Sequence, residues 1–160
     1  MPSKQSTPSV VVVDDEEMVA GALRTFLELE TPYDIRDFTS PREALDALGR
    51  RPADVIIADF MMPELDGVEL LREVRSSWPR TSRILLTGYA DIQNAIRAIN
   101  EAGLYYYLQK PWDNEHLKLV VRNGVERSTL VNELDARITA LENVNQELLE
   151  ARERLIRMFL

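Results

Sequence analysis

The sequence predicts an α/β fold: a doubly wound, five-stranded parallel sheet followed by a long C-terminal helix that forms a coiled coil. Three observations lead to this prediction. Short apolar runs, mostly continuous and β-branched, are typical of strands that are covered on both faces. Helical segments separate these runs, so that strand and helix alternate along the chain. After residue 125, leucines recur every seven residues with no intervening proline or glycine.

The five expected strands coincide with those apolar runs, which lack the strict alternation of a strand with one solvent-facing side. They are Ser9–Val13, Tyr33–Phe38, Ala53–Ala58, Arg83–Thr87 and Leu104–Leu108. Strands joined by helical crossovers pair in parallel. Five such units within about 125 residues predict the flavodoxin-like strand order 2-1-3-4-5, in which ligands bind beyond the carboxyl ends of the strands.

The expected helices fill the segments between the strands. Ser40 and Pro41 have the pattern of an N-cap and a first-turn proline, and Gly103 is placed to end the fourth helix. Pro111 interrupts the chain before the last helix. The other helices are expected at Glu16–Leu29, Val68–Val74, Ile92–Ala102 and Asn114–Val125, the last continuing into the C-terminal helix.

Composition excludes several classes of protein. The 160 residues carry a formal net charge of −8 and include no cysteine, which rules out disulfides and cysteine-ligated zinc. The acidic balance argues against nucleic-acid binding, which needs clustered lysine and arginine. No segment resembles a signal peptide or approaches the roughly 18 apolar residues of a membrane span, so we expect a cytoplasmic protein. Its expected parts are a disordered arm (1–8), a domain (9–125) and a coiled-coil helix (126–160).

Polar side chains follow four of the five strands. Asp14 and Asp15 follow the first strand, Asp59 the third and Lys110 the fifth, while Thr87 ends the fourth. Crowded carboxylates repel one another, and Mg²⁺, which prefers carboxylate, water and phosphate oxygens, relieves that repulsion. A carboxylate beside the metal can attack phosphorus and form an aspartyl phosphate. Lys110 and Thr87 would then neutralise and hydrogen-bond the phosphoryl group.

Each of these residues also has a purely structural interpretation. Asp14 and Asp15 could be only the negative charges favoured at a helix N-terminus, and Asp59 could be a turn residue. Lys110 could be a solvated charge, and Thr87 could fill a strand end. Their joint occurrence at one edge of the sheet favours a phosphoryl-transfer site.

With these residues in place, the chain resembles the chemotaxis-type receiver domain of two-component response regulators over roughly residues 8–125. The matching stretches are residues 10–15, 59–67, 85–90 and 110–111. The resemblance implies that a sensor histidine kinase phosphorylates Asp59, and that Asp14, Asp15, Asp59 and the Met61 backbone carbonyl bind Mg²⁺. Thr87 and Lys110 would contact the phosphoryl group. The domain would be a phosphoacceptor in signalling and not an enzyme.

The resemblance implies further roles around this site. Tyr107 would be the aromatic residue that changes rotamer on activation, although it could instead be a core residue of the fifth strand. Met61 and Tyr89 resemble positions that tune dephosphorylation. Gly67 would give the turn after Asp59 a permissive backbone. His116, the single histidine, is expected on the surface of the last helix.

The heptad pattern of the C-terminal helix predicts a parallel homodimer, since β-branched residues opposite leucine favour two parallel strands and Asn145 can pair across them. Arg152 weakens the pattern, and the alternative is an amphipathic helix folded back on its own domain. The expected contacts are Val131, Leu134, Ile138, Leu141, Asn145, Leu148 and Leu155.

Three functions remain open from the sequence. In the favoured one, phosphorylation of Asp59 is relayed through the dimerising helix to an output domain expected to lie outside this chain. The alternative is a constitutive coiled-coil dimer that acts as a scaffold and carries a silent receiver. An aspartyl-phosphate phosphatase ranks lowest, because such enzymes usually have a second acid two residues after the nucleophile, where this chain has Met61.

Overall fold

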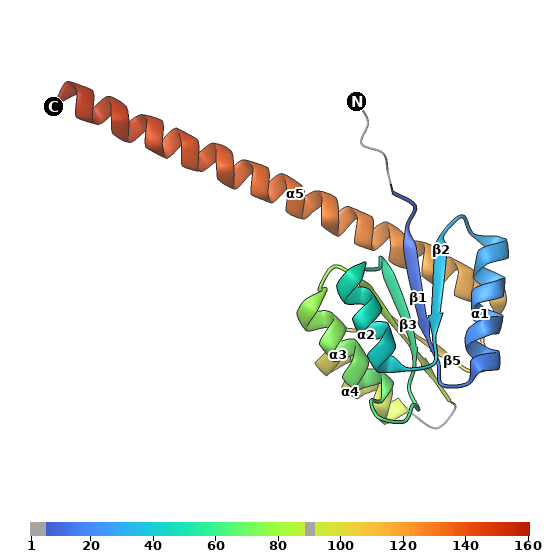
Figure 1. Ribbon diagram of the computed structural model, residues 1–160. Coiled ribbons are helices and arrows are strands. Elements are labelled where there is room, and N and C mark those ends of the chain that lie inside the picture. Colours follow the sequence, from blue (N-terminus) through green and yellow to red (C-terminus); the bar gives the residue numbers. More distant parts are fainter. Residues whose placement is uncertain (1–5, 89–91) are drawn as a thin grey trace. The chain divides into compact units, whose positions relative to one another are not determined.

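The computed structural model describes residues 6–88 and 92–160, apart from the side chains of residues 92, 94 and 95. One parallel sheet of order β2-β1-β3-β4-β5 lies between two layers of helices (Figure 1). The strands are β1 (Ser9–Val13), β2 (Asp34–Phe38), β3 (Val55–Asp59), β4 (Ser82–Thr87) and β5 (Tyr106–Gln109). The helices are α1 (Glu17–Glu30), α2 (Pro41–Arg50), α3 (Gly67–Ser77), α4 (Ile92–Ala102) and α5 (Asn114–Phe159). The predicted sheet and its strand order are confirmed.

The two faces of the sheet carry separate apolar clusters. Val10 and Val12 of β1 belong to the cluster formed with α1 and the first turns of α5. Val11 and Val13 belong to the cluster on the opposite face, formed with α2, α3 and α4. Successive side chains of a strand point to opposite faces. A strand that is buried on both faces therefore needs an unbroken apolar run, as this sequence has.

The ends of the helices reflect specific caps. Asp66 Oδ1 accepts a hydrogen bond from the Glu69 N–H (2.8 Å), and Glu69 Oε2 accepts one from the Asp66 N–H (3.0 Å). This capping box starts α3 one residue before the predicted Val68. Ser40 caps α2 as predicted, and Gly103, with φ of 56°, follows the last residue of α4.

Helix α5 continues without a break at residue 125 and ends at Phe159. The chain divides into a first unit, residues 1–128, and a second unit, residues 129–160. In the second unit the large apolar side chains are exposed, for example Leu134 (57%) and Leu141 (69%). No described helix combines the length and the apolar character that crossing a bilayer requires.

Within the first unit, polar contacts hold α5 to residues at the amino ends of the central strands. Ser82 Oγ donates to the Gly124 carbonyl oxygen (2.7 Å), and Arg127 Nη1 donates to Ser82 Oγ (3.3 Å). Ser128 Oγ lies 3.5 Å from Asp54 Oδ1. These contacts attach α5 to β4 and to the start of β3 as far as residue 128.

The C-terminal end of α4 is attached to β4 by a buried arginine. Arg83 is 5% exposed, and its guanidinium donates to the carbonyl oxygens of Ala102 (2.9 Å) and Gly103 (3.1 Å) and to two carbonyls that precede β4. Burial and two neighbouring arginines lower the pKa of Arg83 to about 10. The group is therefore still a cation at neutral pH, and it complements the partial negative charge of a helix C-terminus.

Candidate functional site

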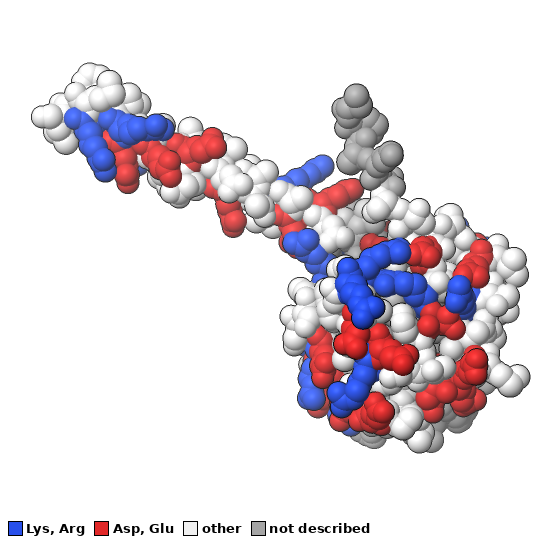
Figure 2. Space-filling view, viewed as in Figure 1, with Lys and Arg blue, Asp and Glu red and all other residues white. Residues whose placement is uncertain are grey.

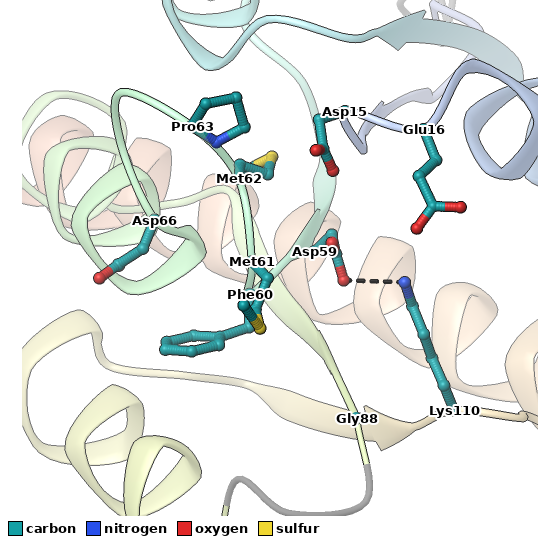
Figure 3. Close-up of a pocket in the computed structure, with 10 residues that line it drawn as sticks. All are labelled: Asp15, Glu16, Asp59, Phe60, Met61, Met62, Pro63, Asp66, Gly88 and Lys110. Carbon is teal, nitrogen blue, oxygen red and sulfur yellow. Dashed lines mark ion pairs between the residues drawn. The ribbon is translucent and has the colours of Figure 1, made fainter.

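A cavity of about 690 Å³ opens at the carboxyl end of the sheet, between β1 and β3 (Figure 3). This is the switch point of a doubly wound sheet, where the sequence predicts a ligand. Side chains from the strand ends and from the β3–α3 turn surround it. Its lining residues are Asp15, Glu16, Asp59, Phe60, Met61, Met62, Pro63, Asp66, Gly88 and Lys110.

Three carboxylates meet at this cavity because β1 and β3 are neighbours and end at the same level. Asp14, Asp15 and Asp59 can each place a carboxylate oxygen within 4.8 Å of the other two. Asp14 is fully buried, Asp59 is 6% exposed, and Asp15 is exposed. The structure therefore brings together the three acids that the sequence singled out, in an arrangement that could hold a metal ion.

Asp14 is held from two sides. Its Oδ1 accepts a hydrogen bond from the Glu16 N–H at 2.9 Å, in the turn before α1. Its Oδ2 accepts one from Lys110 Nζ at 3.3 Å. Asp15 directs its carboxylate into the cavity, as Figure 3 shows. Asp14 thus forms the buried side of the acidic group, and Asp15 forms the open side.

Lys110 reaches the acids from the end of β5. Its Nζ lies 2.9 Å from Asp59 Oδ1 (Figure 3), and its backbone N–H donates to the Thr87 carbonyl oxygen at 2.7 Å. Burial lowers the pKa of Lys110, but the hydrogen bond and charge of Asp59, together with Asp14, outweigh burial and raise it above its ordinary value. The ammonium therefore remains charged beside Asp59 at neutral pH.

The surroundings of Asp59 disfavour its ionised form. Burial has the largest effect and raises the pKa of Asp59; repulsion by Asp14 and Asp15 raises it further, and the opposing hydrogen bond from Lys110 does not fully compensate. The site thus carries more negative charge than its own lysine neutralises. A divalent cation with oxygen ligands would relieve that excess.

Neutralising this residue should stabilise the fold, and we expect Asp59→Asn to melt at a higher temperature at pH 7. Because the pKa of Asp59 is raised in the folded chain, its contribution to stability is present at low pH and lost as the pH rises through the folded pKa. The expected increase in Tm is about 3 °C, corresponding to roughly 1 kcal/mol in a chain of this length. Calorimetry should show the difference at neutral pH and not at about pH 4, near the ordinary pKa of aspartate.

The exposed Asp46 on α2 provides a matched control, since Asp46→Asn makes the same chemical change away from the cavity. Its Tm should equal that of the wild type at both pH values. An Asp59→Asn variant that melts below the wild type at neutral pH would contradict the charge balance described above.

The turn that follows Asp59 brings Gly67 against it. The Gly67 N–H donates to the Phe60 carbonyl oxygen (2.9 Å). A Cβ at Gly67 would lie 2.3 Å from the Asp59 carbonyl oxygen and 2.8 Å from Leu85 Cδ1. The sequence predicted a permissive backbone at Gly67, but the positive φ in this turn (73°) belongs to Glu64. Gly67 is needed for close approach and not for an unusual φ.

Asp66 is a lining residue that the strand-end motifs do not reveal. It caps α3 and at the same time faces the cavity (Figure 3). Its signal in the sequence is an acid three residues before Glu69, the spacing of a capping box. The strand-end argument misses it because Asp66 lies at the start of a helix.

Thr87 and Tyr107 lie near the site but not in the cavity. Thr87 is 2% exposed at the end of β4, and the described lining includes its neighbour Gly88 but not Thr87. Tyr107 is 43% exposed, so it is not the core residue that the alternative interpretation required. It lines a second cavity, of about 490 Å³, beside β5. Tyr89 lies outside the described residues.

His116 is a surface residue, as expected. It is exposed on the first turn of α5, and its Nε2 lies 3.1 Å from Tyr106 Oη. Its backbone N–H donates to Asp113 Oδ1 at 2.9 Å, a contact that caps the start of α5. These contacts account for His116 structurally.

This sheet order, with two acids after β1, Asp59 at the end of β3 and a lysine after β5, defines a doubly wound domain with an acidic site at its carboxyl edge. The chain matches the model of the response regulator receiver domain over residues 10–122, and it belongs to that family. It is similar to the hydrogenase transcriptional regulatory protein HoxA of Cupriavidus necator, with 43% identity over 134 residues, which are 84% of this chain and 27% of that protein.

Other relatives agree with this assignment. The regulatory protein AtoC of Escherichia coli is 33% identical over 125 residues, 78% of this chain and 27% of that protein. The crystal structure of a signal receiver domain of an HD domain-containing protein from Pseudomonas fluorescens has a TM-score of 0.74 and 35% identity, and the match covers 78% of this chain and 98% of that one. The chain thus spans about a quarter of the length of these curated relatives and nearly all of the isolated receiver domain.

Proposed function

We propose that Asp59 accepts a phosphoryl group in a Mg²⁺-dependent reaction. The observation that carries this proposal is the group of three carboxylates within 4.8 Å of one another, with the Lys110 ammonium 2.9 Å from Asp59. Carboxylate oxygens are ligands that Mg²⁺ prefers. Asp14, Asp15 and Asp59, with the Met61 backbone carbonyl, would hold the ion, which would supply charge neutralisation at the phosphoryl oxygens.

The residues of the chain then have distinct tasks. An Asp59 carboxylate oxygen attacks phosphorus, and the bond from phosphorus to the donor breaks as the donor leaves with the electron pair. Lys110 moves from pairing with Asp59 to pairing with the phosphoryl group. The Thr87 hydroxyl donates a hydrogen bond to a phosphoryl oxygen, and Tyr107 changes rotamer in response.

The proposed donor is a sensor histidine kinase, as the family membership suggests. The domain acts as a phosphoacceptor that assists only its own phosphorylation and dephosphorylation, so it is a signalling domain in the cytoplasm and not an enzyme with a separate substrate. The relatives HoxA and AtoC are regulatory proteins of which this chain matches 27%. Their remaining length suggests that the output is a further domain that controls transcription.

The phosphorylation proposal is tested by the intact mass of the chain after incubation with acetyl phosphate and Mg²⁺. We expect the wild type to gain the mass of one phosphoryl group, because Asp59 is the carboxylate of the acidic group that we propose as the nucleophile. Asp59→Asn should gain none, and chelation of the metal should prevent the gain in the wild type. Asp46→Asn should behave as the wild type. A wild-type chain that stays unmodified would refute the proposal and favour a silent receiver.

We also propose that the second unit pairs with a second copy of the chain in a parallel coiled coil. The supporting observation is that its heptad leucines are uncovered: Leu148 is 63% and Leu155 is 55% exposed. A helix stripe of this kind is stable in water only when another apolar surface covers it. The heptad spacing makes a second copy of the same helix the natural partner. The proposed contacts are Val131, Leu134, Ile138, Leu141, Asn145, Leu148 and Leu155.

A further inference from the structure

The described side chains of α4 bury little apolar surface. Among its described side chains, the fully buried apolar ones are Ala98 and Ala102, whereas Ile96 (48%) and Ile99 (52%) are largely exposed. Burial stabilises in proportion to apolar area, and two alanine methyl groups contribute little of it. The described part of α4 therefore depends on polar contacts to stay in place.

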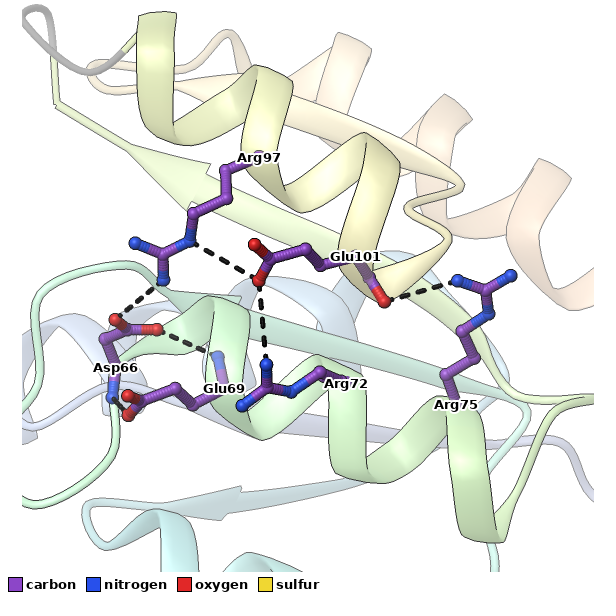
Figure 4. Close-up of polar contacts among 6 residues, drawn as sticks. All are labelled: Asp66, Glu69, Arg72, Arg75, Arg97 and Glu101. Carbon is purple, nitrogen blue, oxygen red and sulfur yellow. Dashed lines mark hydrogen bonds and ion pairs between the residues drawn. The ribbon is translucent and has the colours of Figure 1, made fainter.

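Those polar contacts join α4 to α3. Arg97 Nη2 lies 3.0 Å from Asp66 Oδ2, and Arg97 Nε lies 3.6 Å from Glu101 Oε2. Arg72 Nη1 of α3 lies 3.7 Å from Glu101 Oε2, and Arg75 Nη1 donates to the Glu101 carbonyl oxygen at 3.2 Å. Figure 4 shows these side chains converging between the two helices. Of these contacts, only the Arg97–Asp66 pair also reaches the Asp59 cavity.

Asp66 provides that connection because its side chain takes part in a helix cap, in an ion pair and in the lining of the cavity. It caps α3 through Oδ1, binds Arg97 through Oδ2, and lines the cavity next to Asp59. A rearrangement of the turn between Asp59 and α3 would therefore move the acceptor that holds Arg97. The position of α4 is in this way linked by direct contacts to the phosphoacceptor site.

One hydrogen-bond donor of the Arg97 guanidinium is also without an acceptor among the described residues in this arrangement. Its Nε is buried and has no hydrogen-bond partner within the part of the chain that the structure describes, because Glu101 Oε2, at 3.6 Å, is too distant. A buried donor without a partner is unfavourable. A different arrangement of Arg97 that gave Nε a partner would remove this penalty, which favours movement of Arg97 away from its present position.

We propose that the Arg97–Asp66 ion pair holds α4 against α3 in the unphosphorylated receiver and breaks when Asp59 is phosphorylated. In this arrangement Asp59 is unmodified and pairs with Lys110. The pair is partly exposed, 39% for Arg97 and 28% for Asp66, so its contribution is modest. A contact of that strength holds one state without making the other inaccessible. This inference rests on the proposed function.

The test combines two measurements on Arg97→Gln. Hydrogen exchange of the α4 amides in the free protein should become several-fold faster, because the ion pair no longer holds the helix. Beryllofluoride with Mg²⁺, a phosphoryl mimic, should bind about fivefold more tightly, because the variant no longer loses the ion pair on binding. Arg97→Lys, which can still reach Asp66, should restore both values to near those of the wild type.

Arg24→Gln is the matched control, since Arg24 makes exposed ion pairs with Glu28 and Asp37 away from α4. It should change neither measurement. Unchanged α4 exchange in Arg97→Gln would show that the pair does not hold the helix, and faster exchange with unchanged beryllofluoride affinity would show that it is not coupled to the site. Either result overturns the inference. Failure of the wild type to bind beryllofluoride would instead refute the proposed function.

Discussion

Gly67→Ala is expected to destabilise the domain by about 3 kcal/mol and to abolish phosphorylation by acetyl phosphate. The added Cβ would lie 2.3 Å from the Asp59 carbonyl oxygen and 2.8 Å from Leu85 Cδ1. The first of these is a backbone atom that cannot rotate away, so the turn or the end of β3 must shift, and overpacking of this kind costs roughly 1–3 kcal/mol or more. Chemical denaturation and intact mass after acetyl phosphate measure the two effects.

Gly21→Ala provides the contrast, because a Cβ at Gly21 meets nothing within 4 Å. The same substitution within α1 should raise stability by about 0.5–1 kcal/mol through helix propensity, and phosphorylation should proceed as in the wild type. The two alanine substitutions are thus expected to change the stability in opposite directions. If Gly67→Ala is as stable and as reactive as the wild type, the close approach at Asp59 has no functional importance.

Replacing Ile138 and Leu141 together by lysine is expected to convert the proposed dimer to a monomer. Both positions are apolar heptad positions, 44% and 69% exposed in the single chain, and charged side chains there would face their own copies across the interface. The loss should exceed a hundredfold in dimer affinity, or about 3 kcal/mol. Sedimentation equilibrium gives the association constant, and circular dichroism shows whether the sheet is retained.

Ala136 and Asn143 provide the control. Ala136 lies two positions before Ile138, and Asn143 lies two positions after Leu141. Both are on the side of the helix opposite the heptad core, so lysine at both adds the same charge without entering the interface. This variant should remain a dimer. A monomeric wild type would refute the pairing directly, and a dimeric Ile138→Lys, Leu141→Lys variant would show that another surface forms the dimer.

The sheet could be predicted from the sequence largely because β1 and β3 can be interpreted only as strands. Val10–Val13 and Ile56–Ala58 are buried on both faces, and such continuous apolar runs lack the periodicity of an amphipathic helix. The acids and the lysine could also be located, since parallel strands end at one edge and each of these residues lies at or just after the end of a strand. These parts of the site depend on local pattern and topology alone.

The remaining features depend on contacts between residues distant in the chain. The approach of Gly67 to Asp59 arises when the β3–α3 turn folds against the end of β3, and the pairing of Arg97 with Asp66 arises when α4 packs against α3. No spacing in the sequence reveals either contact. Arg83 illustrates the same limit. It lies in an apolar strand and would be expected to reach solvent, yet the carbonyl groups at the end of α4 solvate it inside the domain.

The buried position of Arg83 has a consequence for how α4 can move. The Arg83 guanidinium, with a pKa of about 10, would lose its carbonyl ligands if the C-terminal end of α4 moved away. We therefore expect α4 to tilt about Ala102, with its N-terminal end moving most. Ile92 lies ten residues from that point, about 15 Å along the helix axis, so a tilt of about 10° displaces the first turn by roughly 2.5 Å while the last turn hardly moves.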